Sequence, residues 1–215
     1  MLHTAEARWF IPEALPDAVL DWFRTGQSLA SEGVQVHEYL LFPDCDSVGV
    51  KLRDGRFEIK AVRCASQPLS LDCGINGRIE QWVKWSFASE ALQALDPALH
   101  QSGRWLKVRK ERFLRRFSAE RGRLAEIMVA QAPLPLVGCN IEVTRIDVDA
   151  NPRFWLSLGF EAFGPATVTG PILEDTLSLF FSEHGCIPGM TLSEYESASY
   201  PAWLKKLYST FEPLS

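Results

Sequence analysis

The stretch VGVKLRDGRFEIKAVR, residues 48–63, decides the fold of this chain. Two runs of alternating residues are joined by Asp54-Gly55, the strongest short signal for a β-hairpin in the sequence. Because residues i and i+2 share one face of a strand, Lys51 and Arg53 lie on the same face. The stretch therefore predicts two paired strands that carry charge on one face.

The same alternation of charged and apolar residues recurs in a fixed order along the chain. It is found in residues 50–53, 57–60, 78–84, 107–110, 141–145 and 159–163. In a half-buried sheet such charges normally face water. If several of these strands close into a barrel, one charged face lines the interior instead. A lumen that holds both basic and acidic side chains suits a polyanion together with its metal ion.

Composition excludes few classes of protein. The 215 residues suffice for one large domain or two small ones with a sizeable core. A content of 47% hydrophobic and 23% charged residues is typical of a globular protein. The net charge of −5 argues against a nucleic-acid surface, although six basic residues gather between positions 107 and 116. We expect no nucleic-acid partner.

The cysteines and histidines indicate neither a disulfide scaffold nor a zinc site. The five cysteines are odd in number and none forms C-x-x-C, which favours a reduced, cytoplasmic protein, with Cys64–Cys73 pairing as the alternative. The four histidines lie far apart and show no zinc spacing. No apolar run approaches ~18 residues, and the first residues lack the pattern of a signal peptide. We expect no membrane partner.

Further elements follow from periodicity. Strands are expected at residues 4–10, 38–42, 105–117, 137–148 and 154–163, and helices after Asp17, from Ser89, from Ser118, at 172–181 and at 202–211, with a capping box at Thr191-x-x-Glu194. At least seven strands with mostly late helices predict an α+β protein built on an antiparallel barrel. Residues 1–215 form one domain in this interpretation, with a helical part from about residue 170.

The order of the charged segments resembles the CYTH group of triphosphate tunnel metalloenzymes. The resemblance covers most of residues 4–205 and rests on VKLR, FEIK, RIEQWVK, LKVRKER, IEVTRIDV and LGFEAF, with Ser199-Tyr200-Pro201 similar to the closing helix of the family. It implies an eight-stranded antiparallel tunnel. Members of the family hydrolyse triphosphates, including inorganic and thiamine triphosphate, or cyclise ATP.

The resemblance also implies roles for individual residues. The phosphate ligands would be Lys51, Arg53, Lys60, Lys107 and Arg109, and a Mg²⁺ or Mn²⁺ ion would be held by Glu6, Glu142 and Glu161. The other tunnel-lining residues would be Arg8, Glu58, Arg78, Glu80, Lys84 and Arg145. Arginine offers forked donors to phosphate oxygens and lysine a compact charge. Water would be the nucleophile, so no catalytic side chain is assigned.

Two segments depart from the family pattern. Glu6-Ala7-Arg8 stands where E-x-E-x-K is expected, and Glu161-Ala162-Phe163 stands in place of E-x-E. The leading hypothesis is therefore a metal-dependent phosphohydrolase that acts on a triphosphate or polyphosphate. The first alternative is a tunnel that binds a phosphorylated ligand without turnover. The second is an unrelated small-molecule-binding barrel with an apolar interior.

Simpler structural explanations remain open for several of these residues. Lys51 and Arg53 can be solvent-facing charges, and Glu58–Lys60 or Glu80–Lys84 can be cross-strand ion pairs. We expect surface positions for Arg112, Arg115 and Arg116, and core positions for Trp82 and Trp85.

Overall fold

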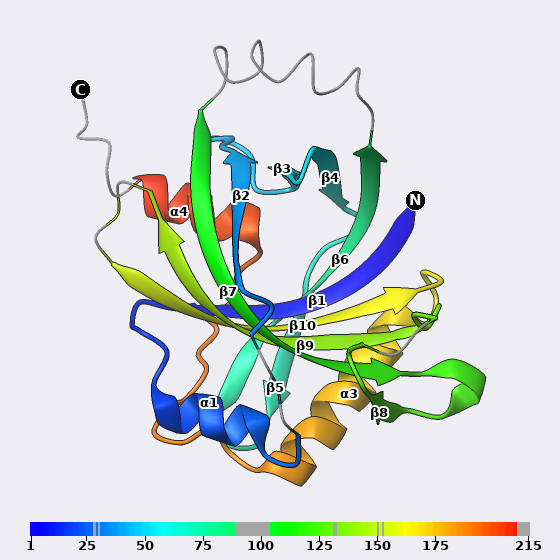
Figure 1. Ribbon diagram of the computed structural model, residues 1–215. Coiled ribbons are helices and arrows are strands. Elements are labelled where there is room, and N and C mark those ends of the chain that lie inside the picture. Colours follow the sequence, from blue (N-terminus) through cyan, green and yellow to red (C-terminus); the bar gives the residue numbers. More distant parts are fainter. Residues whose placement is uncertain are drawn as a thin grey trace.

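The computed structural model describes residues 1–27, 29, 31–88, 104–130, 133–149, 151 and 153–209. Eight antiparallel strands form a closed barrel, because the last strand in the order pairs back to the first (Figure 1). The order is β1 (Leu2–Ile11), β10 (Phe154–Gly164), β9 (Gly138–Val148), β7 (Trp105–Ser118), β2 (Val34–Leu40), β3 (Val48–Arg53), β4 (Arg56–Val62) and β6 (Ile75–Ala88). The predicted α+β class and eight-stranded antiparallel barrel are confirmed.

The hairpin predicted at Asp54-Gly55 joins β3 to β4. Asp54 has φ 51° and Gly55 has φ 68°, the left-handed conformation that both central residues of a type I′ turn require. Lys51 therefore lies opposite Glu58 in the register of the two strands. Two short strands extend the barrel wall: β5 (Gln67–Leu71) pairs with β6, and β8 (Ala125–Ile127) pairs with β7.

The outer face of one side of the barrel carries the main hydrophobic core. Ala5, Ala7 and Trp9 of β1 are buried there, with partners on β9 and β10. Helices α1 (Asp17–Arg24) and α3 (Thr169–His184) cover this face (Figure 1). Alternation along β1 sends Glu6 and Arg8 to the opposite face, toward the lumen.

Helix α4 (Tyr200–Ser209) closes the end of the barrel at which β1 ends. Trp203 stacks on Phe10, with ring centroids 4.3 Å apart, and a second cluster of buried residues forms around this pair. The cluster includes Val108 of β7 and Ile146 of β9, whose side chains point into the barrel. One end of the interior is therefore apolar and filled.

Three of the helical predictions agree with the structure and one does not, and the helix expected after Asp17 corresponds to α1. The helices expected at 172–181 and 202–211 correspond to α3 and α4, the latter described as far as Ser209. The helix expected from Ser118 is wrong: a short 3-10 turn, η1 (Glu120–Gly122), and β8 occupy this segment. Arg121 and Gly122 have φ 57° and 70°, which interrupts a helix.

Other local expectations need correction as well. Asp17 is the first residue of α1 rather than its cap, which is Pro16. A turn rather than a helix follows Thr191, and Ser193 donates to the Glu196 carboxylate within it. The helix expected from Ser89 lies outside the described residues.

The cysteine expectation is wrong for one pair. Cys73 and Cys186 form a disulfide, which joins the turn between β5 and β6 to the segment after α3. The alternative pairing, Cys64 with Cys73, is wrong too, and Cys64 is a free, exposed thiol. The two bonded cysteines are 113 residues apart in sequence, so only the fold reveals their proximity. No helix in the described part of the chain is long and apolar enough to span a membrane.

Candidate functional site

A cavity of about 410 Å³ occupies the barrel interior. Each of the eight barrel strands contributes side chains to it, and Tyr200 at the start of α4 lies in its wall. Among the lining residues that the structure describes, eight basic side chains face four carboxylates, an excess of four formal positive charges: Arg8, Lys51, Arg53, Lys60, Lys84, Lys110, Arg112 and Arg116 against Glu6, Glu58, Glu142 and Glu161. The volume falls in the range of sites for small organic ligands.

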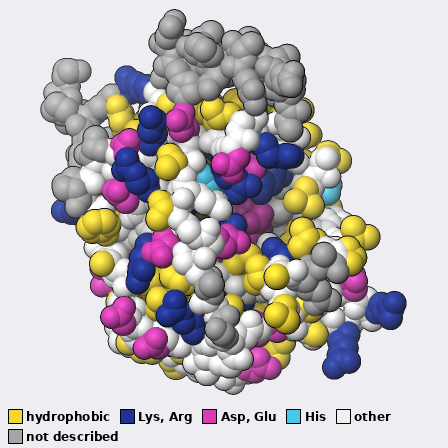
Figure 2. All heavy atoms as spheres, in the orientation of Figure 1, with side chains coloured by type: hydrophobic (Ala, Val, Ile, Leu, Met, Phe, Trp, Pro, Cys, Tyr) yellow, Lys and Arg dark blue, Asp and Glu magenta, His cyan; other side chains and the backbone are white. Residues whose placement is uncertain are grey.

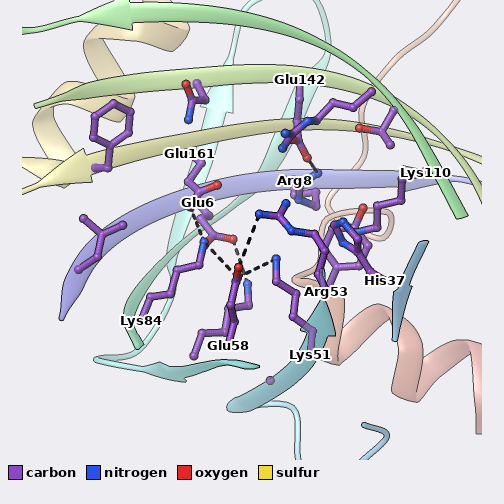
Figure 3. A pocket seen from close by; sticks show the side chains of 18 of the residues that line it. Glu6, Arg8, His37, Lys51, Arg53, Glu58, Lys84, Lys110, Glu142 and Glu161 are labelled. Atoms are coloured by element: carbon purple, nitrogen blue, oxygen red, sulfur yellow. Dashed lines mark hydrogen bonds and ion pairs between the residues drawn. The ribbon is translucent and has the colours of Figure 1, made fainter. Parts of the chain in front are cut away.

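Three of the carboxylates are paired with lysines from other strands of the barrel. Glu6 accepts a hydrogen bond from Lys60 at 3.0 Å, and Glu58 pairs with Lys51 at 2.9 Å. Lys84 lies 3.5 Å from Glu161 and 3.9 Å from Glu58 (Figure 3). Burial alone would raise the pKa of Glu6, but the charges of Lys60, Arg8 and Lys84 lower it overall. Burial of Glu58 is likewise outweighed by the charges of Lys51 and Lys84, which lower its pKa, so Glu6 and Glu58 stay ionised at neutral pH.

The fourth carboxylate, Glu142, is held by two arginines. The Arg8 guanidinium lies 2.6 Å from Oε1 and that of Arg112 lies 3.2 Å from Oε2. Burial opposes ionisation of Glu142, yet Arg8 and Arg112 hold its pKa well below the ordinary value. Arg8 also donates to Ser157 at 2.9 Å.

Gly159 makes the contact between Arg8 and Glu142 possible. In the strand register it lies between them, opposite Arg8 on one side and Glu142 on the other. A Cβ atom at this position would lie 2.5 Å from Cζ of Arg8, so any side chain would displace the guanidinium. Gly159 therefore leaves the space through which Arg8 crosses β10.

The deeper part of the cavity contains cations whose contacts are mainly aromatic. Lys110 donates to the Tyr39 hydroxyl at 2.6 Å, and its Nζ lies 3.4 Å from the Tyr200 ring centroid. Burial and the charge of Lys51 lower the pKa of Lys110 well below its ordinary value. Burial and Lys84 lower the pKa of Lys51 to about 8. Burial and the charges of Lys110 and Lys51 lower the pKa of His37 to about 2.

These shifts share one physical cause. Positive charges have been brought together in a confined, poorly solvated place, where each disfavours the protonated form of its neighbours. Titratable groups that are perturbed in this way inside a cavity are typical of functional sites. An anion in the cavity would stabilise the protonated forms of Lys51, Lys110 and His37 and so raise their pKa values.

Most of the predicted site residues meet in the cavity. Lys51, Arg53 and Lys60 of the predicted phosphate set line it, as do all three predicted metal ligands, Glu6, Glu142 and Glu161, together with Arg8, Glu58 and Lys84. The interpretation that Lys51 and Arg53 face solvent is therefore wrong. An apolar interior, as in the unrelated-barrel alternative, is not what the cavity shows.

The prediction for β7 placed the wrong residues inside. Lys107 and Arg109 lie on the outer face, about half exposed, where Lys107 is 3.9 Å from Glu38 and Arg109 pairs with Asp149 at 2.7 Å. Lys110 and Arg112, on the opposite parity, line the cavity instead. Two of five predicted phosphate ligands thus lie outside the barrel.

Three other predicted lining residues do not line the cavity. Arg78 pairs with Glu194 at 2.9 Å, and Arg145 pairs with Glu111 at 2.8 Å, both at partly exposed positions. Glu80 lies opposite Glu6 in the strand register, but it is not among the cavity-lining side chains.

The surface positions expected for Arg112, Arg115 and Arg116 of β7 are wrong. Arg112 and Arg116 line the cavity. Arg115 is buried, pairs with Glu126 at 2.6 Å and donates to the carbonyl of Phe23 at the end of α1. The core position predicted for Trp82 is confirmed, while Trp85 is only partly buried.

Sequence reasoning missed several residues of the cavity. Gln35, His37 and Tyr39 alternate along β2, and this alternation could have revealed them had the strand been started before residue 38. In the sequence Tyr200 stands out only as part of the Ser-Tyr-Pro signature, and the structure places its ring against Lys110.

The donor set for a divalent metal is small. The described residues contain no group of three or more Asp, Glu, His or Cys side chains arranged to hold a metal ion. Glu6 and Glu161 lie directly opposite each other in the register, whereas Glu142 is engaged by two arginines. Mg²⁺ is often bound through one or two carboxylates plus substrate phosphates. Glu6 and Glu161 meet this carboxylate count, but Lys60 and Lys84 already pair with them.

Comparison with known proteins yields similar structures but no family. No protein-family model matches the chain, and no curated protein matches it. Three similar solved structures are a conserved hypothetical protein of Pyrococcus furiosus (10% identity, TM-score 0.41, covering 93% of this chain and 98% of that chain) and two proteins of Pyrococcus horikoshii. These are PH1012, with 13% identity and a TM-score of 0.42 over 90% of this chain and 93% of that chain, and PH1819, with 13% identity and a TM-score of 0.42 over 96% of this chain and 99% of that chain. At these TM-scores the likenesses carry no argument about function.

Proposed function

We propose that this protein is a CYTH-like tunnel protein that binds a triphosphate or a comparable phosphorylated anion inside its barrel. The observation that carries the proposal is the excess of four formal positive charges in the cavity. Burying cations without counter-charges costs stability, so their accumulation in one cavity favours an anionic ligand.

The chemistry of the cavity suits phosphate. Arg8, Arg53 and Arg112 provide forked donors, and Lys51 and Lys60 provide compact charges. A triphosphate offers acceptor oxygens at several points along its length, so cations on several strands can contact one ligand. The existing carboxylates orient these cations and limit the number of negative charges that the cavity accepts.

The test is calorimetric titration with inorganic triphosphate. Lys51→Met removes a cavity charge and should weaken binding by about 1.5–3 kcal/mol, the range for a hydrogen bond to a charged group. Lys107→Met is the matched control, because Lys107 occupies the outer face and should leave the affinity unchanged. Equal affinities of the Lys51 variant and the wild type would contradict the proposal.

Metal-dependent hydrolysis is the second candidate function. The specific observation in its favour is the opposed pair Glu6 and Glu161 within the cavity. Lys60 and Lys84 neutralise this pair, so a metal ion would have to displace them or share the carboxylates with them. Phosphate release from inorganic triphosphate with Mg²⁺ or Mn²⁺, lost in Glu161→Gln, would establish turnover; binding without release would establish capture alone.

A further inference from the structure

We propose that the ligand is an amphiphile, in which a phosphate or diphosphate head enters the charged cavity and a hydrocarbon chain lies on the apolar rim of the cavity. The inference rests on the proposed function and deepens it by naming the class of ligand. The apolar rim consists of Leu2, Leu134, Pro135 and Phe163, all of which line the cavity.

The rim lies at the open end of the barrel. Leu2 is the first residue of β1, Phe163 is near the end of β10, and Leu134 precedes β9, so all three lie opposite the end that α4 closes. Leu2 is 41% exposed and Leu134 is 61% exposed although both line the cavity. The cavity therefore reaches the surface between apolar side chains, and Figure 2 shows a charged hollow with hydrophobic side chains beside it.

Exposed apolar side chains that border a ligand cavity indicate contact with an apolar group. Their neighbours strengthen the pattern, because Met1 and Leu136 are 84% and 82% exposed. Phe163 is the only aromatic residue among the four described residues of the rim, which is otherwise aliphatic. Sites for nucleobases use stacked aromatic platforms. A hydrocarbon chain matches this surface better than a base does.

Charge and distance constrain the shape of the ligand. Leu2 and Arg8 lie six residues apart on β1, about 20 Å at ~3.3 Å per residue. Lys84 lies opposite Leu2, so the charged wall begins directly below the rim. A molecule that contacts both Leu2 and Arg8 is elongated, and one with its negative charge at one end matches the order of the two regions.

The experiment measures the affinity of n-alkyl diphosphates, from methyl to decyl, below their aggregation concentrations. Affinity should rise roughly twofold to fourfold per methylene once the chain reaches the rim, as expected for burial of CH₂ groups. The double variant Leu2→Ser/Leu134→Ser should abolish this rise and leave the affinity for inorganic triphosphate unchanged. That unchanged affinity also shows that the variant is folded.

Phe154→Ser is the matched control, because Phe154 is 63% exposed at the start of β10, at the far end of the barrel. It should retain the full dependence on chain length. Affinity that is independent of chain length, or a rise that persists in the double variant, would overturn the inference while leaving the proposed function intact. Tighter binding of ATP than of decyl diphosphate would overturn it too, as would attachment to phosphatidylglycerol vesicles without any chain-length effect in solution. Failure of every phosphate compound to bind would refute the proposed function itself.

Discussion

The two faces of β1 bury opposite kinds of side chain. On the outer face Ala5, Ala7 and Trp9 are buried under helices, where apolar contact stabilises the fold. On the inner face Glu6 and Arg8 are buried among other charges, where desolvation offsets much of the gain from pairing. The outer face therefore holds the barrel together, and the inner face carries the charges on which the proposed binding depends. Mutations on the two faces should separate stability from binding.

The largest effect should come from the apolar face. Phe180 of α3 is fully buried and packs against Trp22, Phe23 and Phe160. Phe180→Ala should lower the free energy of unfolding by about 3–5 kcal/mol, measured by urea denaturation. Triphosphate affinity measured well below the midpoint should not change. A loss of affinity in the folded variant would show that the two faces are coupled.

Glu142→Gln should have the second largest effect, because it leaves Arg8 and Arg112 without their shared carboxylate. We expect a loss of about 3 kcal/mol in the free energy of unfolding at pH 7. The folded-state pKa of Glu142 is lowered, so its contribution is present above the unfolded pKa and disappears as the pH falls. Wild-type and variant stabilities should therefore converge in acid, and a constant difference between them would contradict this account.

Lys110→Met should affect binding and stability in opposite directions. Methionine keeps the length of the side chain and removes a buried charge that burial and Lys51 disfavour. The free energy of unfolding should rise by about 1 kcal/mol, while triphosphate affinity should fall by about 1.5–3 kcal/mol. Thermal denaturation and calorimetry on the same samples test both. A variant that is less stable and binds normally would place Lys110 in the structural core.

The smallest expected effect is the uptake of protons when an anion binds. Lys51 has a pKa of about 8 in the free protein, lowered from 10.5, so between these values the unfolded chain binds more protons and stability rises with pH. A bound anion should raise this pKa again. Binding near pH 8 should then take up protons, visible as a dependence of the calorimetric heat on the buffer. Lys51→Met should lose most of this dependence, and Lys107→Met should keep it.

The hairpin shows what the sequence can predict. Asp54-Gly55 fixes the register of β3 and β4, and the barrel closure then follows from the order of alternating segments. The parity of Lys51 and Lys60 is correct because each of these strands has one consistently charged face. The Cys73–Cys186 disulfide had no local signal, since it joins segments that only the fold brings together.

Strand β7 shows why the rest could not be predicted. Its inner face changes from Val108, which packs near α4, to Lys110 and Arg112 in the cavity. Its outer face changes from exposed Arg109 to Phe113, which is covered in the main core. Neither face of β7 is uniformly charged or uniformly apolar. Because Lys107 and Arg109 alternate with apolar Leu106 and Val108, the alternation assigned these two charged residues to the charged inner face. Only the position of α4 reveals where the switch occurs.

The charged cavity also leaves the rest of the chain acidic. The whole chain has 22 basic and 27 acidic residues, and removing the eight and four of the cavity leaves 14 against 23, a net charge of −9 for the remainder. At physiological ionic strength charges are screened beyond about 8 Å, so the attraction of the cavity for an anion acts only close to its mouth. In the proposed function this favours a small anion that enters with every charge inside over a long polyanion, most of whose charges would stay outside.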